Sequence, residues 1–424
     1  MHLTIVALGS RGDVQPCVAL GRGLRQAGLK VRLASYRAFA DLVQSHGLEF
    51  APIQGDPREA LEDRSGQEWM ESGGSMLKFI GRIRNLTTFE ILRQSLDDAV
   101  EACLGTDAIL YTPLGAAGYH IAEKMDLPCL YMALQPASRS REAPSIFAPR
   151  LPLGGTYNWW TTVFTEQALW QSVRVPFNRW RRETLGLPAM SFSGPFNKLY
   201  RDRQPFIYGY SEHVAPKPSD WPAWHHITGY WFLPRDEAWS PPPELATFLS
   251  QGSQPISIGF GSMSGAVAQR LTRLAIRACA TAGLRAVLLG GWAKAEDLDL
   301  PESICALDSA PHDWLFPRMA AVVHHGGAGT TAAGLRAGVP SILVPFFGDQ
   351  PFWGRRVHAL GVGPKPMLRS RLTADWLAEA LTLATSDEEM QARAGQLGEK
   401  IRAEHGVDRA VEIILRYLSD GSAE

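Results

Sequence analysis

The chain has 424 residues and a formal net charge of −1, with 20% charged and 45% hydrophobic residues. This length predicts two domains or one large α/β domain, and the balanced charge excludes the strongly basic composition of a nucleic-acid binder. The first apolar run, residues 3–8, is too short for a signal sequence and lacks its basic lead, and no run is long enough to span a bilayer. Five scattered cysteines without metal-ligand spacing are typical of a reducing compartment: Cys17, Cys103, Cys129, Cys279 and Cys305. We therefore expect a soluble cytoplasmic protein.

The first half of the chain alternates strand-like and helix-like segments. We expect strands at residues 3–8, 30–35, 49–53, 108–111 and 128–133. We expect helices at residues 14–27, at about 38–46 and after Gly115. Repeated β–α units of this kind predict a parallel sheet with helices on both faces. Residues 54–100 and 135–205 interrupt the alternation.

A proline-rich stretch at residues 234–243 has the composition of an inter-domain linker. The alternation then begins again, with expected strands at 256–260, 285–289 and 304–307 and a helix at about 266–282. From residue 373 onward, apolar residues at a spacing of three to four predict helices. The two halves therefore look like two copies of one layered design.

The most informative stretch of the second half follows an apolar run at 320–323 and reads His-His-Gly-Gly-Ala-Gly-Thr-Thr. The run predicts a buried strand, and the glycines predict a turn into a helix. A helix N-terminus offers unpaired N–H groups and positive potential, and glycines let an anion approach them. We expect Gly327, Gly329 and Thr330 to hold a phosphate group, with His325 donating a hydrogen bond to it. The alternative is a tight turn whose histidines have structural partners.

A carboxylate and an amide, Asp349 and Gln350, follow the next apolar run at 342–344. Together they offer the acceptors and the donor that sugar hydroxyls require. Loops that leave the carboxyl ends of neighbouring parallel strands converge on one crevice. The turn and this pair are therefore predicted to bind one ligand, a nucleotide sugar. The alternative is a polar loop that precedes Pro351.

Residues 324–331 and 345–354 together resemble the donor-binding signature of UDP-dependent glycosyltransferases with two Rossmann-like domains. The likeness is strongest to sterol 3-β-glucosyltransferases, and bacterial antibiotic-aglycone glycosyltransferases are similar too. Four further runs resemble the sterol branch: Gly-Ser-Arg-Gly-Asp-Val-Gln-Pro at 9–16, Thr-Gly-Tyr-Trp at 228–231, Gly-Phe-Gly-Ser-Met at 259–263 and Pro-His-Asp-Trp-Leu-Phe at 311–316.

This resemblance implies an α/β fold of two Rossmann-like domains that face each other across a cleft, the GT-B type. The implied bounds are an acceptor-binding domain at 1–234, a linker at 235–243 and a nucleotide-sugar domain at 244–406. The terminal helix, within 407–424, is expected to cross back and pack on the first domain. The implied donor is UDP-glucose. No cofactor and no metal is expected, because positive potential at the glycine turn replaces a cation.

The run at 9–16 follows the first strand and opens the first helix, and it offers a candidate base. Inverting transfer needs a group that takes the proton from the acceptor hydroxyl. Related enzymes carry a histidine or an aspartate in this loop, and the chain has no histidine between His2 and His46, which favours Asp13. Ser10 is expected to contact the donor. Alternatively, Asp13 is only the N-cap of the helix. The helix N-terminus would lower the pKa of Asp13, and burial would raise it.

Further donor contacts are expected from the resemblance. Ser262 is expected to reach the phosphates or the ribose, although an ordinary turn serine is the alternative. Ala310, His312 and Trp314 are expected to line the uracil site. Plant relatives place a stacking tryptophan just before this segment, where the chain has Ser309. Trp314 is alternatively part of the core.

Residues 139–203 contain ten Arg or Lys residues against four Asp or Glu residues, interleaved with tryptophans. An aromatic wall suits a bulky apolar acceptor, which Trp159, Trp160 and Trp170 would contact. The same composition suits peripheral contact with an anionic membrane. The third interpretation is a helical pair that packs its tryptophans into the first domain.

The sequence predicts an inverting glucosyltransferase that uses Asp13 as base and His325 at the leaving group. It would move glucose from UDP-glucose to a hydroxyl of a lipophilic small molecule such as a sterol or triterpenoid. One alternative is a dTDP- or UDP-sugar transferase for a macrolide, polyketide or peptide antibiotic aglycone. A nucleotide-sugar epimerase would leave the aromatic segment unexplained, and a non-catalytic binder would not need Asp13, His325 and Asp349 together.

Overall fold

The computed structural model describes residues 1–55, 89–260, 265–290 and 300–419. Backbone contacts divide the chain into two compact units, which are treated separately below. Unit 1 comprises Met1–Leu233 and Glu404–Glu424, and unit 2 comprises Pro234–Ala403. Each unit contains one parallel sheet with helices around it. The predicted α/β fold class with two Rossmann-like domains is confirmed.

Unit 1 is built on a seven-stranded sheet in the order β3-β2-β1-β4-β5-β6-β7, in which every neighbouring pair is parallel. The strands are β1 (His2–Val6), β2 (Lys30–Tyr36), β3 (Glu49–Ile53), β4 (Ala108–Tyr111), β5 (Cys129–Ala133), β6 (Phe206–Tyr208) and β7 (His225–Ile227). The helices are α1 (Arg11–Gln26), η1 (Arg37–Phe39), α2 (Ala40–Gln44), α6 (Phe89–Ala102), α7 (Ala117–Met125), α8 (Gly154–Glu183), α9 (Phe196–Arg201) and α17 (Gly406–Ser419).

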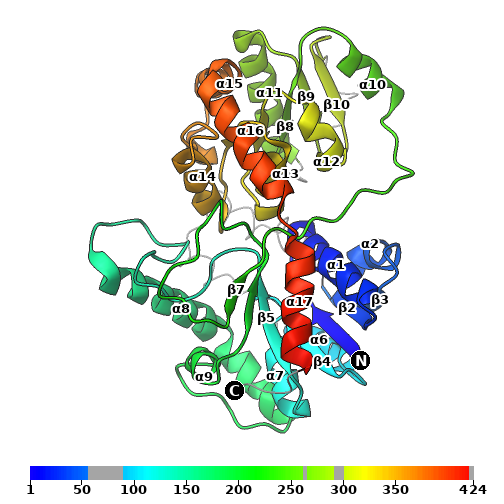
Figure 1. The fold of residues 1–424 in the computed structure, drawn as a ribbon, viewed down its shortest axis with the longest axis vertical. Coiled ribbons are helices and arrows are strands. Elements are labelled where there is room, and N and C mark those ends of the chain that lie inside the picture. Colours follow the sequence, from blue (N-terminus) through cyan, green and yellow to red (C-terminus); the bar gives the residue numbers. More distant parts are fainter. Residues whose placement is uncertain (56–88, 261–264, 291–299, 420–424) are drawn as a thin grey trace. The chain divides into compact units, whose positions relative to one another are not determined.

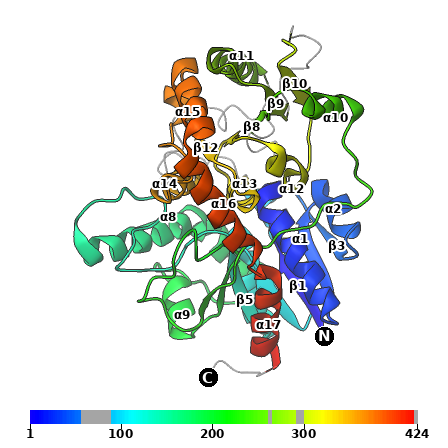
Figure 2. The same ribbon diagram turned by 45° about the horizontal axis from the view of Figure 1, so that its top comes forward.

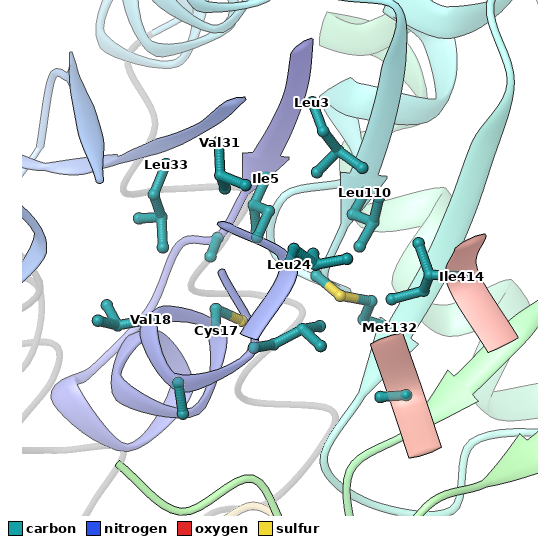
Figure 3. Close-up of a cluster of buried hydrophobic side chains, with 14 of the residues drawn as sticks. Leu3, Ile5, Cys17, Val18, Leu24, Val31, Leu33, Leu110, Met132 and Ile414 are labelled. Atoms are coloured by element: carbon teal, nitrogen blue, oxygen red, sulfur yellow. The ribbon is translucent and has the colours of Figure 1, made fainter. Parts of the chain in front are cut away.

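One large apolar cluster joins the sheet of unit 1 to α1 and α17 (Figure 3). Leu3 and Ile5 from β1 meet Val18 from α1 and Ile414 from α17, and all four side chains are fully buried. Buried apolar area of this kind is the main favourable term in folding. It therefore fixes α1, and the loop in front of it, to strand β1.

The last helix, α17, lies alongside α1 in both views of the ribbon (Figures 1 and 2). The close approach depends on Gly23, because a Cβ at that position would lie 2.5 Å from Cγ1 of Val407. The chain thus leaves unit 1 after Leu233 and returns to it at Glu404. The predicted return of the C-terminal helix to the first domain is confirmed.

Unit 2 is built on a five-stranded parallel sheet in the order β10-β9-β8-β11-β12. Its strands are β8 (Ile256–Gly259), β9 (Ala286–Leu289), β10 (Ile304–Leu307), β11 (Val322–His324) and β12 (Ser341–Leu343). Its helices are α10 (Pro243–Ser250), α11 (Gly265–Ala282), α12 (His312–Leu315), η3 (Phe316–Arg318), α13 (Ala328–Ala337), α14 (Gln350–Ala359), η4 (Arg369–Arg371), α15 (Ala374–Ser386) and α16 (Glu388–Arg402).

Three local expectations differ from the structure. Helix α1 begins at Arg11 rather than at residue 14, so Pro16 lies inside the helix. Strands β6 and β7 were not predicted, because three residues are too few to show a period. The third interpretation of residues 139–203 differs only in form: α8 is one helix of 30 residues followed by the short helix α9, and Trp170 and Trp180 of α8 are buried, as that interpretation expects.

Candidate active site

The loop between β1 and α1 holds the carboxylate of Asp13 against Ser10. The backbone N–H and the Oγ–H of Ser10 both donate to Oδ2 of Asp13, each over 2.8 Å. Ser10 is the N-cap of α1 and Asp13 its third residue, so the alternative in which Asp13 is the N-cap is wrong. Burial raises the pKa of Asp13 by more than the hydrogen bonds from Ser10 lower it. A raised pKa suits a group that accepts a proton near neutral pH.

Asp13 also lies at the topological switch point of its sheet. The strands β2 and β3 continue on one side of β1, and β4 to β7 continue on the other. Ligands of open α/β sheets bind at the carboxyl ends of the strands at such a point. The loop after β4 packs on the end of β1, because a Cβ on Gly115 would lie 2.1 Å from the carbonyl oxygen of Val6. The Asp13 loop therefore occupies the position where this fold places ligand contacts.

Only some of the tryptophans on helix α8 are exposed to solvent. Trp170 is 4% exposed, and its indole N–H donates to the carbonyl oxygen of Ser191 over 3.3 Å. Trp160 is 58% exposed, and Trp159 packs edge-on against it with ring centres 5.0 Å apart. Trp170 is thus a core residue of unit 1, and the expectation of an acceptor contact rests on Trp159 and Trp160.

Two arginines of the basic segment are paired with carboxylates, Arg181 fully buried and Arg139 partly buried, a feature that sequence reasoning missed. Arg139 binds Glu166 on α8 over 2.6 Å. Arg181, only 2% exposed, donates from Nη1 to Glu123 over 2.7 Å and to Nδ1 of His120 over 2.8 Å. Burial and the Arg181 charge lower the pKa of His120 to about 3, so this histidine is neutral and accepts. Neither arginine offers its charge to an anionic surface, which weakens the membrane interpretation.

In unit 2, the predicted phosphate turn joins β11 to α13. Gly326 adopts a left-handed φ of 89°, and Gly327 is the N-cap of the helix. Gly329 and Thr330 lie in the first turn of α13, where the backbone N–H groups have no partner within the helix. Thr331, in contrast, is fully buried and points its hydroxyl into the protein. Glycine access and a helix N-terminus thus coincide as expected.

The two histidines before this turn have different surroundings. His324 is 1% exposed, and its Nδ1 accepts the N–H of Gly326 over 3.1 Å, a structural contact. His325 lies over the turn, because a Cβ on Gly327 would come within 2.6 Å of its Nε2. Its Nδ1 is buried and has no hydrogen-bond partner in the described part of the chain. Burial lowers the pKa of His325 to about 4, so it is a neutral donor at pH 7.

Asp349 and Gln350 follow β12 at the start of α14. Oδ2 of Asp349, the N-cap, accepts the indole N–H of Trp353 over 2.7 Å. Oε1 of Gln350 accepts the backbone N–H groups of Phe346 and Phe347 over 2.7 and 3.2 Å. Both residues therefore shape their own loop. The Gln350 carbonyl oxygen is engaged there by two backbone N–H groups.

The segment expected to line the uracil site follows β10. Ala310 is 9% exposed, and the ring of His312 stacks on Phe316 at 4.3 Å. Trp314 packs against Trp239 with ring centres 5.1 Å apart and carries Arg318 over its face at 4.3 Å. The contacts of Trp314 are thus those of a packed side chain. The expected contact from Ser262 lies outside the described residues.

The loops of unit 2 gather at its own switch point, where β9 and β10 continue on one side of β8 and β11 and β12 on the other. The phosphate turn leaves β11 at this point. The Asp349 loop is next to it, because a Cβ on Gly326 would lie 3.2 Å from the carbonyl oxygen of Gln350. The fold therefore brings the predicted phosphate and sugar contacts together.

Other features of the described residues do not point to a second centre. A cavity of about 880 Å³ between β2, β3 and α6 is lined by none of the predicted site residues. Within the described ranges, no three His, Cys, Asp or Glu side chains are grouped so as to hold a metal ion. No helix of those ranges combines the length and apolarity needed to cross a bilayer.

Comparison with known proteins finds one family match near the start of the chain and another near its end. Residues 3–144 match the glycosyltransferase family 28 N-terminal domain, and residues 289–414 match the erythromycin biosynthesis protein CIII-like C-terminal domain. The chain is 40% identical over 434 aligned positions to a sterol 3-beta-glucosyltransferase of Emericella nidulans, and 38% identical over 444 to one of Cryptococcus neoformans. These alignments cover 99% of the chain but 30% and 27% of the relatives, so the chain spans under a third of their length.

Solved structures agree in fold along nearly the whole chain. The glycosyltransferase of kitacinnamycin aligns with a TM-score of 0.70 at 22% identity, covering 98% of this chain and 99% of that one. The glycosyltransferase VinC, solved in complex with dTDP, aligns with a TM-score of 0.65 at 20% identity, covering 99% and 100%. The chain therefore combines a glycosyltransferase family 28 N-terminal domain with an erythromycin-CIII-like C-terminal domain, on the fold of two Rossmann-like domains that it shares with these solved structures.

Proposed function

We propose that the protein transfers glucose from UDP-glucose to a hydroxyl of a lipophilic small molecule, with inversion at the anomeric carbon. The observation that carries this proposal is the Asp13 carboxylate at the switch point of unit 1, with a pKa raised by burial. The sterol 3-beta-glucosyltransferase relatives favour a glucosyl donor and a sterol-like acceptor. The exposed rings of α8, Trp160 foremost, offer a surface for such an acceptor.

In this reaction the acceptor oxygen bonds to the anomeric carbon while the bond from that carbon to the diphosphate breaks. The hydroxyl proton passes to Asp13, and the bonding electron pair leaves with UDP. The first-turn N–H groups of α13 and the neutral His325 would stabilise the charge that develops on the diphosphate. Asp349 and the Gln350 amide N–H groups would bind sugar hydroxyls. We propose that the helix N-terminus takes the place of a divalent cation.

The test is the Asp13→Asn variant, assayed with UDP-glucose and a sterol panel. Without a base, turnover falls by about 10²–10⁴-fold, whereas UDP affinity by calorimetry stays close to wild type. The matched control is Asp126→Asn, because Asp126 ends α7 in a left-handed conformation that asparagine also adopts. Near wild-type kcat in the Asp13 variant contradicts the assignment.

A panel of UDP- and dTDP-sugars with sterols and antibiotic aglycones, analysed by mass spectrometry, separates the remaining alternatives. We expect a glucosylated sterol, formed in the presence of EDTA. A product with a deoxysugar on an aglycone supports the antibiotic branch instead. Conversion of the nucleotide sugar without an acceptor supports an epimerase.

A further inference from the structure

The two oxygens of the Asp13 carboxylate differ in their surroundings. Oδ2 accepts two hydrogen bonds, from the backbone N–H and from the Oγ–H of Ser10. Oδ1 accepts none from the described residues, and it is not among the buried atoms that lack a partner. One oxygen is therefore tied to the loop, and the other is accessible.

Gly9, in the loop before α1, leaves room for Oδ2 of Asp13. Gly9 has a left-handed φ of 129°, and a Cβ there would lie 2.5 Å from Oδ2 and 2.8 Å from Cγ of Asp13. A Cβ at these distances would force the carboxylate of Asp13 to move. Gly9 leaves the space and Ser10 supplies the donors, so two consecutive residues fix one carboxylate orientation.

The two hydrogen bonds to Oδ2 determine which oxygen of Asp13 can take a proton. An oxygen that already accepts two hydrogen bonds is a poor proton acceptor, because protonation would oppose both donors. The open oxygen therefore takes the proton. The same two donors favour the charged carboxylate and oppose the upward effect of burial on its pKa.

We propose that Ser10 is a positioning residue of the transfer reaction, which makes Oδ1 of Asp13 the atom that receives the acceptor proton, and that it is not a ligand of the donor phosphates. The proposal rests on the proposed function of Asp13 as base. It replaces the expectation that Ser10 contacts the donor, because its hydroxyl hydrogen is already committed to Asp13.

The test compares Ser10→Ala with Ser10→Thr over a range of pH. The alanine variant loses one donor to the carboxylate, so the acid limb of kcat/KM moves up by about one pH unit. Its kcat falls about 10-fold while the KM for UDP-glucose stays unchanged. Threonine keeps the hydroxyl and is also a favourable N-cap, so Ser10→Thr returns the acid limb to its wild-type position. Thermal melts of both variants confirm that α1 is intact.

A second measurement does not depend on turnover. The pKa of Asp13 is read by carbon NMR of the carboxyl group, assigned by difference against Asp13→Asn, and it rises in Ser10→Ala. An unmoved pKa and acid limb together with a raised KM for UDP-glucose overturn the proposal and make Ser10 a donor ligand. Full turnover of Asp13→Asn instead overturns the proposed function itself, whatever the carboxyl titration shows.

Discussion

At the scale of single residues, the position of the proposed base depends on a neighbouring glycine that has no functional group of its own. Gly9 precedes Ser10 in the loop and Gly12 follows two residues later in the first turn of α1, but of the two only Gly9 has a positive φ and a missing Cβ that faces the carboxylate of Asp13. A Cβ on Gly12 would meet nothing closer than Oγ of Ser10 at 3.6 Å, an ordinary contact. Two glycines that look alike in the sequence therefore differ in function.

Gly9→Ala should lower kcat by about 10²-fold, because the new Cβ displaces the carboxylate from its position. Gly12→Ala is the matched control. It lies in the first turn of α1, where alanine is tolerated, and it should keep kcat within about twofold of wild type. Steady-state kinetics at saturating donor measure both variants. Equal kcat values for the two would show that the geometry at Asp13 is not limiting.

At the scale of elements, α8 is held to the rest of unit 1 by a buried charge as well as by apolar contacts. Arg181 contacts Glu123 and His120, which both lie on α7, and donates from Nε to the carbonyl oxygen of Pro188 over 3.0 Å. Burying an arginine costs desolvation free energy, and these partners offset that cost. Removing the side chain would leave Glu123 and His120 without their common donor.

Arg181→Ala should therefore lower the free energy of unfolding by about 3 kcal/mol. The neighbouring Arg182 is exposed, and Arg182→Ala should change it by no more than about 0.5 kcal/mol. Urea unfolding followed by tryptophan fluorescence compares the two variants, since Trp180 is in the same cluster. Equal effects of the two substitutions would contradict a structural role for Arg181.

At the scale of the whole molecule, stability should depend on buried neutral histidines. Burial lowers the pKa of His120 and of His225 to about 3, whereas an unfolded histidine titrates at 6.5. Between these values the unfolded chain binds more protons, so stability is complete above pH 6.5 and is lost as the pH falls toward 3. Each of these histidines removes about 2 kcal/mol at pH 5 relative to pH 7.

His225→Leu removes one of these groups from unit 1, where the ring stacks on Phe206 at 4.5 Å. The variant is expected to be less stable at pH 7, yet to lose about 2 kcal/mol less than wild type between pH 7 and pH 5. His405→Gln, at a side chain that is 76% exposed, should keep the wild-type dependence. Urea titrations at pH 7, 6 and 5 measure this, and parallel curves for all three proteins would refute the buried-histidine origin.

Predictability from sequence also differed with scale. The turn at Gly326 was predictable, because few residues other than glycine adopt its left-handed backbone. The pairing of Arg181 with Glu123 was not, since the partners are 58 positions apart and charged residues usually lie at the surface. The Gln350 carbonyl looked free in the sequence, and only the folded loop shows that backbone N–H groups of Phe346 and Phe347 engage it.

The sequence alone was enough to predict the parallel α/β architecture and the loops that carry Asp13, His325 and Asp349, and its resemblance to glycosyltransferases implied the return of the terminal helix. The architecture and these loops follow from local patterns, because hydrophobic period and glycine position are properties of consecutive residues. Which atoms of those residues remain available depends on the folded structure. Ser10 engages one oxygen of Asp13, the loop backbone engages Gln350, and the core takes Trp170. Hydrogen bonds and burial depend on neighbours in space, which the order of residues does not specify.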